Sequence, residues 1–280
     1  MTSEAHSARY FALLYSPTPQ RLVLDALFGI EREVNDSLRR GLDHNVAHSR
    51  LQWWREECER ATGGQPVHPL TRALVEALPA ANPVPQLSGL SGLVDVAVWD
   101  LAGATFETRR ELTAYCERWA AAMVEPLVPY TVGGASVSAP SISDWRSLGA
   151  SVREIELLTE LAREAHYGRL RVPLDELESA NADARTLATP PWPETVAALL
   201  RARHRSLRGE IARAAGNSNS EQQAALRGVL VWAAVVWRLS RRVESALPDR
   251  LRTGRFDAIA DGWFAWRIAR RATLGRFRLN

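Results

Sequence analysis

Apolar residues recur with a period near 3.6 residues along almost the whole chain, and convincing alternation of apolar and polar residues is absent. A period near 3.6 places apolar side chains on one face of a helix, whereas a strand buried on one face needs a period of two. The pattern therefore predicts an all-α protein. With 280 residues, of which 46% are hydrophobic, the chain can bury a sizeable core and is too apolar to be disordered. We expect one domain over residues 1–280.

Charge and cysteine usage narrow the classes of partner. The net charge is +3, and every basic residue is an arginine. A biased genome explains the absence of lysine as easily as a function does, so we expect no nucleic-acid partner. Cys58 and Cys116 have neither metal-site nor disulfide spacing. The N-terminus lacks the apolar run of a signal peptide, and the longest apolar run, Gly228–Trp237, is too short to span a bilayer. We expect a cytoplasmic protein in which that run is a buried helix.

The segment from Leu148 to Leu177 concentrates charge in helical register. One stripe of the expected helix carries Arg153, Glu156, Glu160, Arg163, Glu164 and Tyr167. The opposite side carries Leu158, Leu161 and Ala165, which form the apolar face that a packed helix needs. Gly168 is expected to end the helix. Such a stripe fits a solvated surface as well as the polar wall of a site.

The same segment resembles the second signature of the squalene/phytoene synthase family of head-to-head isoprenoid synthases. The matching positions are Leu148, Gly149, Leu158, Gly168, Arg169, Pro173 and Asp175. Two metal-binding aspartates of the signature fall on Glu160 and Glu164, so the charge is kept on a longer side chain. Its Gln, Asn and Arg positions are Arg153, Glu156 and Thr159 here.

A second resemblance to that family lies in Ala26–Leu38. Its first signature is matched at Ala26, Leu27, Arg32, Val34 and Asp36, but the first aspartate is Asn35 and the third is Arg39. In the family, two aspartate-rich motifs face each other across a cavity and hold Mg²⁺ ions that bind the substrate diphosphates. Mg²⁺ prefers carboxylate oxygens and water, and a guanidinium repels it. The resemblance therefore implies the isoprenoid-synthase fold with a degenerate metal site.

Other segments extend the resemblance over nearly the whole chain. Residues Arg50 to Pro69 match the family's tryptophan-rich region, in which His68 is expected to start a helix and not to bind a metal. Residues 93–122 are expected to form two helical pieces. Glycines that give room for a prenyl chain in active members are Ala121 and Val124 here, which narrows a cavity. Tyr115 and Trp119 either line what remains or belong to the core.

The resemblance yields a set of candidate site residues. The candidates for metal or diphosphate binding are Asp36, Glu160 and Glu164. The candidates for lining the cavity are Phe28, Arg32, Asn35, Arg39, Tyr115, Trp119, Arg153, Glu156, Arg163, Tyr167 and Arg169. Because arginines now stand where metal ligands stood, we expect ion pairs from Arg39 or Arg32 to Glu160 or Glu164 across the old diphosphate mouth.

Two functions of different classes follow from this resemblance. The first is a protein that keeps the fold without the usual Mg²⁺ chemistry and binds an isoprenoid, another lipid or a protein partner, as in the branch of the family that assembles respiratory complex I. No cofactor is expected in that case. The second is an active prenyltransferase in which Asp36, Glu160 and Glu164 hold one Mg²⁺ ion.

The C-terminal segment mixes aromatic and basic residues in helical register. Trp263 and Trp266 stand among Arg267, Arg270 and Arg271. This composition is typical of a helix at a membrane surface or against a partner. The other interpretation is a terminal helix that is docked on the protein through its tryptophans, with the arginines in water.

Overall fold

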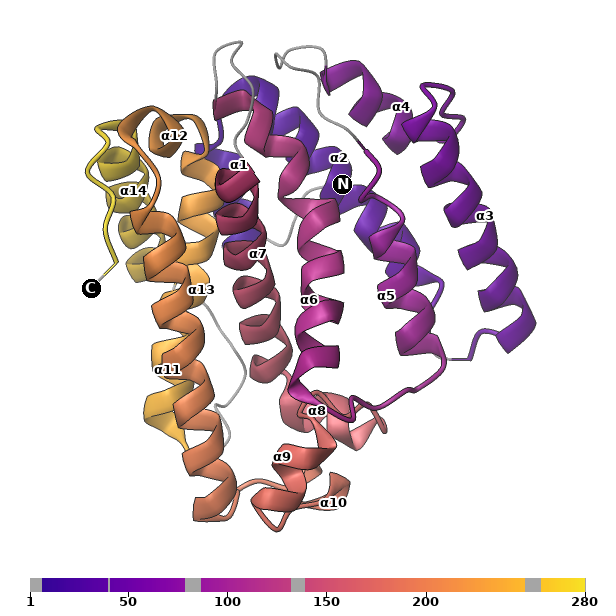
Figure 1. Ribbon diagram of the computed structural model, residues 1–280, viewed down its shortest axis with the longest axis vertical. Helices are drawn as coiled ribbons and strands as arrows, with labels where there is room; N and C mark the ends of the chain where they lie inside the picture. Colours follow the sequence, from indigo (N-terminus) through magenta and orange to yellow (C-terminus); the bar gives the residue numbers. More distant parts are fainter. Residues whose placement is uncertain (1–6, 40, 79–86, 132–138, 250–257, 280) are drawn as a thin grey trace.

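The computed structural model describes residues 7–39, 41–78, 87–131, 139–249 and 258–279, and within these ranges it contains helices and no strand (Figure 1). The all-α prediction is thereby confirmed. The helices in chain order are α1 (Ala8–Tyr15), α2 (Thr18–Asp36), α3 (His44–Thr62), α4 (Pro69–Ala77), α5 (Gly92–Leu101), α6 (Arg109–Met123), the 3-10 helix η2 (Glu125–Thr131), α7 (Ala139–Thr159), α8 (Leu161–His166), α9 (Leu174–Ser179), α10 (Ala184–Ala188), α11 (Glu194–Gly216), α12 (Ser220–Ala225), α13 (Arg227–Ala246) and α14 (Ala258–Thr273).

Helices α6 and α7 run beside each other through the middle of the molecule (Figure 1). Helices α11 and α13 pack on α7, and α1 and α14 pack on α13. Helix α2 packs on α4 and α5, and α3 covers α5 on the outside. Helices α1, α2, α6, α7 and α13 thus converge on one interior region.

The apolar run at the start of α13 is buried, as its sequence predicts. Val229 through Val236 are each at most 2% exposed. Gly228 begins this run where α1 approaches α13 closely, since a Cβ added there would lie 2.6 Å from the Ala12 carbonyl oxygen. The short distance between these two helices holds α1 over the interior.

Several local predictions are confirmed at helix starts and breaks. The His68 ring accepts a hydrogen bond from the Leu70 amide at 3.2 Å, which caps the first turn of α4. Residues 93–122 form two pieces, α5 and α6. Gly168 has a φ of +80°, a conformation that a residue with a side chain rarely adopts, and it lies two residues after the end of α8.

The structure differs from the expected helices in three places. The helix expected through Tyr167 breaks at Glu160 into α7 and α8, where Thr159 Oγ1 donates to the Ile155 carbonyl at 2.6 Å and competes with the helical hydrogen bonds. The apolar periodicity over residues 221–246 predicts one helix, but the structure divides it at Leu226 into α12 and α13. The polar, proline-bearing segment over residues 178–193 predicts a connection, but it contains α10, whose first turn is closed by reciprocal bonds between Asp183 and Thr186.

Within the described ranges, no helix has the length and apolar character needed to cross a membrane.

Candidate functional site

A buried carboxylate on α2 marks the interior region where the helices converge. Glu31 is 3% exposed and lies on the same face of α2 as Leu27 and Val34. Both of its oxygens accept hydrogen bonds from the guanidinium of Arg9 on α1, and one accepts from Trp119 Nε1 at 2.8 Å. Burial alone raises the pKa of Glu31, but the charges of Arg9 and Arg153 and these hydrogen bonds outweigh it and leave the pKa below its ordinary value.

Glu156 on α7 forms the second acidic position of the same group. Its carboxylate lies 3.5 Å from Arg9 Nη2 and 3.7 Å from Arg153 Nη1, and it accepts from Trp232 Nε1 at 3.1 Å. Arg153 also lies 3.9 Å from Glu31 and sits over the Trp119 ring. We call Arg9, Glu31, Arg153 and Glu156 the central cluster. Two arginines and two carboxylates balance there, so the cluster has no net charge to neutralise.

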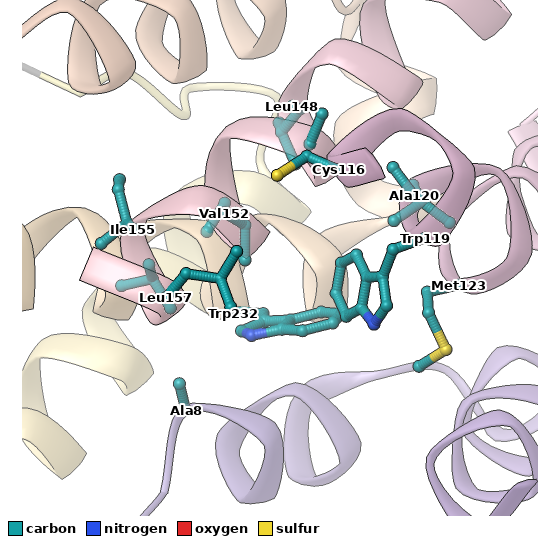
Figure 2. Packing of buried hydrophobic residues seen from close by; sticks show 14 of the residues in the cluster. Ala8, Cys116, Trp119, Ala120, Met123, Leu148, Val152, Ile155, Leu157 and Trp232 are labelled. Carbon is teal, nitrogen blue, oxygen red and sulfur yellow. The ribbon is translucent and has the colours of Figure 1, made fainter. Parts of the chain in front are cut away.

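Aromatic rings fill the space beneath the central cluster. Trp119 and Trp232 lie beside each other with ring centroids 5.6 Å apart (Figure 2). Phe28 packs edge-on against Trp232 at 5.2 Å. Trp119 and Trp232 are each 1% exposed, and Phe28 is 7% exposed. These rings are therefore core side chains of the interior.

A second charged group joins α5, α6, α8 and the segment after α8. Arg171, which is 3% exposed, donates to Asp100 at 2.7 Å and to Glu164 at 3.1 Å. Tyr115 donates to the other oxygen of Asp100 at 3.0 Å. Burial, followed by the charge of Asp100, raises the pKa of Tyr115 to about 12, so its hydroxyl keeps the proton that it donates. We call Asp100, Glu164 and Arg171 the Asp100 cluster.

A pocket of about 330 Å³ lies where the two clusters meet, and its wall contains as many arginines as carboxylates. The lining residues are Asn35, Leu38, Asp100, Arg153, Glu156, Leu157, Glu160, Arg163, Glu164, Arg169 and Arg171. Arg163 lies 3.3 Å from Glu160 and 3.8 Å from Glu164, and Arg169 lies 3.7 Å from Glu164. Each carboxylate of the wall therefore has a cation beside it.

The structure brings together seven of the candidate residues and separates the others from the pocket. Asn35, Arg153, Glu156, Glu160, Arg163, Glu164 and Arg169 line it, whereas Phe28, Tyr115 and Trp119 are packed core residues. Arg32, Asp36, Arg39 and Tyr167 are not among its lining residues. Tyr167 is 46% exposed and packs on the neighbouring His166 ring.

The prediction that Arg39 forms an ion pair with Glu160 or Glu164 is wrong. Arg39 pairs with Asp36 on its own side at 3.4 Å, and its side chain is 75% exposed. Residues 37–39 continue beyond the end of α2, which carries Arg39 away from α8. The three least exposed cations that meet the site's carboxylates come from α1, α7 and the segment after α8, namely Arg9, Arg153 and Arg171.

Arg9, Arg171 and Glu31 were not predicted from the sequence, for different reasons. Glu31 has a signal, because it is a charged residue on the apolar face of α2. Arg171 stands between Arg169 and Pro173, two matching positions of the second signature, and is not itself a match. Arg9 has no sequence signal, since its role depends on how α1 packs against α13.

The residues present do not fit the family's magnesium site. In the part of the chain that the structure describes, no three His, Cys, Asp or Glu side chains are grouped so that they could hold a metal ion. Asp36 lies outside the pocket, and Glu160 and Glu164 face arginines. Mg²⁺ is usually held by one or two carboxylates together with water and substrate phosphates, and each carboxylate of this pocket already has an arginine beside it.

Val124, just after the end of α6, is in close contact with α7. Val124 is 1% exposed and packs on α7, since a Cβ added at Gly149 would lie 2.8 Å from Val124 Cγ2. Helices α6 and α7 thus approach closely where the family has a glycine. That the larger side chain narrows a cavity here stays a prediction.

Comparisons with known proteins place this geometry in a family. The family model described as squalene/phytoene synthase matches residues 3–260. A crystal structure of a dehydrosqualene synthase in complex with ligand is similar, with 14% sequence identity, a TM-score of 0.76, and coverage of 95% of this chain and 90% of that one. The squalene synthase HpnC from Alicyclobacillus acidocaldarius is similar with 17% identity, a TM-score of 0.67, and coverage of 84% and 87%.

No curated protein sequence matches the chain. The two solved structures show a shared helical fold, in agreement with the isoprenoid-synthase fold that the signatures imply. Since the family model matches all but the first two and the last 20 residues, this chain belongs to the squalene/phytoene synthase family.

Proposed function

We propose that this protein is a non-catalytic member of its family, which binds a lipid or protein partner and does not condense prenyl diphosphates by the magnesium route. The central cluster carries this proposal. Glu31 and Glu156 are held by Arg9 and Arg153, so the acidic groups inside the bundle are neutralised by the protein itself. A metal ion would have to displace guanidinium groups that are already hydrogen bonded and partly buried.

The size and character of the pocket support the same proposal. Pockets that bury an organic ligand are mostly apolar and measure roughly 300–1,000 Å³. The pocket here lies at the lower end, with about 330 Å³, and its wall is largely charged. The apolar region below it is occupied by Trp119 and Trp232. A prenyl chain would need these rings to move.

An active prenyltransferase with an altered site is the second candidate. The observation in its favour is that Glu160, whose side chain is 42% exposed, and Glu164 both line the same pocket. In that case a metal would bind at the outer part of the pocket, above the Asp100 cluster.

One experiment separates the two candidates. Purified protein is incubated with farnesyl or geranylgeranyl diphosphate and Mg²⁺, with a dehydrosqualene synthase as the positive control, and diphosphate release and hydrocarbon products are measured. We expect no product above the uncatalysed background and no rise in melting temperature with Mg²⁺. Product formation that is lost in the Glu160→Gln, Glu164→Gln variant would establish the second candidate and overturn the proposal.

A further inference from the structure

The C-terminal helix is docked through small residues and not through its tryptophans. On α14, the buried positions are Asp261, Ala265, Ile268, Ala269 and Ala272, each at most 6% exposed. They follow the spacing of one helical face, and that face packs against α13. The interpretation in which the tryptophans dock the helix is therefore wrong, and another role is needed for them.

The opposite face of α14 exposes large apolar side chains to solvent. Trp263 is 60% exposed, Trp266 is 44% exposed, and Ile259 and Leu274 are 86% and 57% exposed. Their ring centroids place Trp263 and Trp266 6.0 Å apart, on successive turns of the helix. Ile259, Trp263 and Trp266 lie on the side of α14 opposite its buried residues, whereas Leu274 follows the end of the helix. Exposed apolar side chains gathered in this way commonly mark an interaction surface.

Arginines surround these tryptophans. The Arg267 guanidinium lies 5.4 Å from the Trp263 ring centroid, and that of Arg270 lies 5.8 Å from the centroid of Trp266. Among the residues that the structure describes, no carboxylate forms an ion pair with Arg241, Arg267, Arg270 or Arg271. The acidic residue of α14 itself, Asp261, is 1% exposed and is bound by Arg242 and Arg238. Among the described residues, this face therefore carries positive charge without an exposed carboxylate on α14.

A groove of about 1020 Å³ between α13 and α14 continues this surface. It is lined by aromatic and aliphatic side chains and by arginines: Trp237, Arg238, Arg241, Arg242, Ser245, Ile259, Ala260, Trp263, Phe264 and Arg267. Arg241 sits over the Trp237 ring at 5.3 Å, so cation and ring alternate along the groove. Of the described residues that line the groove, none is a carboxylate.

We infer that α14 and this groove dock on an anionic lipid bilayer, with Trp263 and Trp266 at the level of the headgroups. Tryptophan suits that depth because its ring is apolar and its N–H still finds a hydrogen-bond acceptor. Arginines on either side of the rings meet lipid phosphates and the negative surface potential. The occupant is a lipid surface, because exposed rings bordered by arginines match a layer that is anionic at its surface and apolar beneath it. The inference goes beyond the proposed function and holds whether or not the central pocket is catalytic.

The test is binding of the full chain to vesicles of phosphatidylcholine, and to vesicles in which part of that lipid is replaced by phosphatidylserine. We expect co-sedimentation with the anionic vesicles only, and weaker binding as salt rises, since ions screen exposed charge. The variant Trp263→Ala, Trp266→Ala should bind about tenfold more weakly. The variant Arg267→Glu, Arg270→Glu should bind anionic vesicles at least about fivefold more weakly for each arginine replaced, because one basic residue contributes about that factor at a charged membrane.

Matched controls separate a local surface from bulk charge. The variant Arg110→Glu, Arg118→Glu makes the same change in net charge at exposed positions of α6, away from α14 (Figure 1). Trp53→Ala removes a tryptophan that is 39% exposed on α3. Both should keep binding, and far-ultraviolet dichroism should show unchanged helix content in all variants.

Quenching by brominated lipids reports whether the rings enter the bilayer. We expect brominated lipids to quench the tryptophan fluorescence of the unmodified chain. Most of this quenching should disappear in the variant Trp263→Phe, Trp266→Phe. Equal binding to both vesicle types, or an equal loss in the α6 control, would overturn the inference. Concentration-dependent dimerisation that the Trp263→Ala, Trp266→Ala change abolishes would overturn it in favour of a second copy of the chain as the occupant.

Discussion

Arg9 on α1 donates hydrogen bonds to both carboxylate oxygens of Glu31 on α2, with the second bond measuring 3.2 Å. The carboxylate is almost fully buried, whereas the Arg9 side chain is 27% exposed. The Arg9 side chain of α1 thereby covers the buried Glu31 carboxylate. The same guanidinium lies 5.1 Å from the Phe28 ring and 5.6 Å from the Trp232 ring, so it also packs against the aromatic floor.

Replacing Arg9 by alanine should lower the free energy of unfolding by about 3 kcal/mol. The buried Glu31 carboxylate then keeps only the hydrogen bond from Trp119 and the charge of Arg153 at 3.9 Å. The measurement is equilibrium denaturation in urea. The matched control is Arg39→Ala, which removes an arginine from an exposed pair with Asp36 and should change the free energy by less than about 0.5 kcal/mol.

Replacing both members of the pair tests whether the stability loss in Arg9→Ala comes from an unpaired Glu31 carboxylate. The variant Arg9→Met, Glu31→Leu leaves no unpaired charge, so it should recover most of the stability that Arg9→Ala loses. If Arg9→Ala and Arg39→Ala cost the same, the buried pair has no special place in the fold.

The fold class and the position of the pocket could be predicted from the sequence because both depend on local patterns. The 3.6 period and the two signatures identify α2, α7 and α8, and seven of the residues chosen from them line the pocket. The His68 cap also follows from residues that are adjacent in the sequence.

The partners of the site's charges could not be predicted, because they depend on packing between helices distant in sequence. Arg9 and Glu31 are 22 residues apart, and Arg171 and Asp100 are 71 residues apart. The break at Glu160 also turns α8 out of the register of α7, so the single stripe expected on one helix belongs to two helices. The exposure of Trp263 and Trp266 depended on which face of α14 meets α13, and alanines decided it.

Replacing Gly228 by alanine should separate α1 from α13, since the added Cβ would lie 2.6 Å from the Ala12 carbonyl. We expect a loss of about 1–3 kcal/mol in the free energy of unfolding, as for other overpacked positions. Gly209→Ala is the control, because the Cβ there meets no atom within 4 Å and a helical glycine gains up to about 1 kcal/mol on this change. The two alanine variants should therefore shift the urea midpoint in opposite directions. Shifts of the same sign would mean that the close approach of α1 does not constrain the fold.

Restoring aspartates at the end of α2 should not create a conventional synthase. The variant Asn35→Asp, Arg39→Asp adds carboxylates, but Glu164 stays bound by Arg171, and Trp119 and Trp232 still occupy the interior. We expect no squalene or phytoene from prenyl diphosphates with Mg²⁺, as measured by mass spectrometry of extracted products. Product formed by this variant and not by the unmodified chain would show that the α2 ligands alone limit catalysis.

A buried histidine should make stability depend on pH through a single residue. His204 on α11 is 1% exposed, and its Nδ1 lies 2.9 Å from Ser240 Oγ, which also accepts from Arg208. Burial, followed by the charge of Arg208, lowers the pKa of His204 to about 4, while Glu244 opposes this weakly. Below pH 6.5 the unfolded chain binds a proton at this histidine that the folded chain does not bind, so this residue's contribution to stability falls from pH 6.5 to about pH 4. The difference amounts to about 3 kcal/mol over that window. His204→Gln should flatten the pH dependence of the urea midpoint there, relative to the unmodified chain and to His166→Gln at an exposed histidine. Parallel profiles for His204→Gln and the unmodified chain would show that carboxylates alone set the acid sensitivity of this fold.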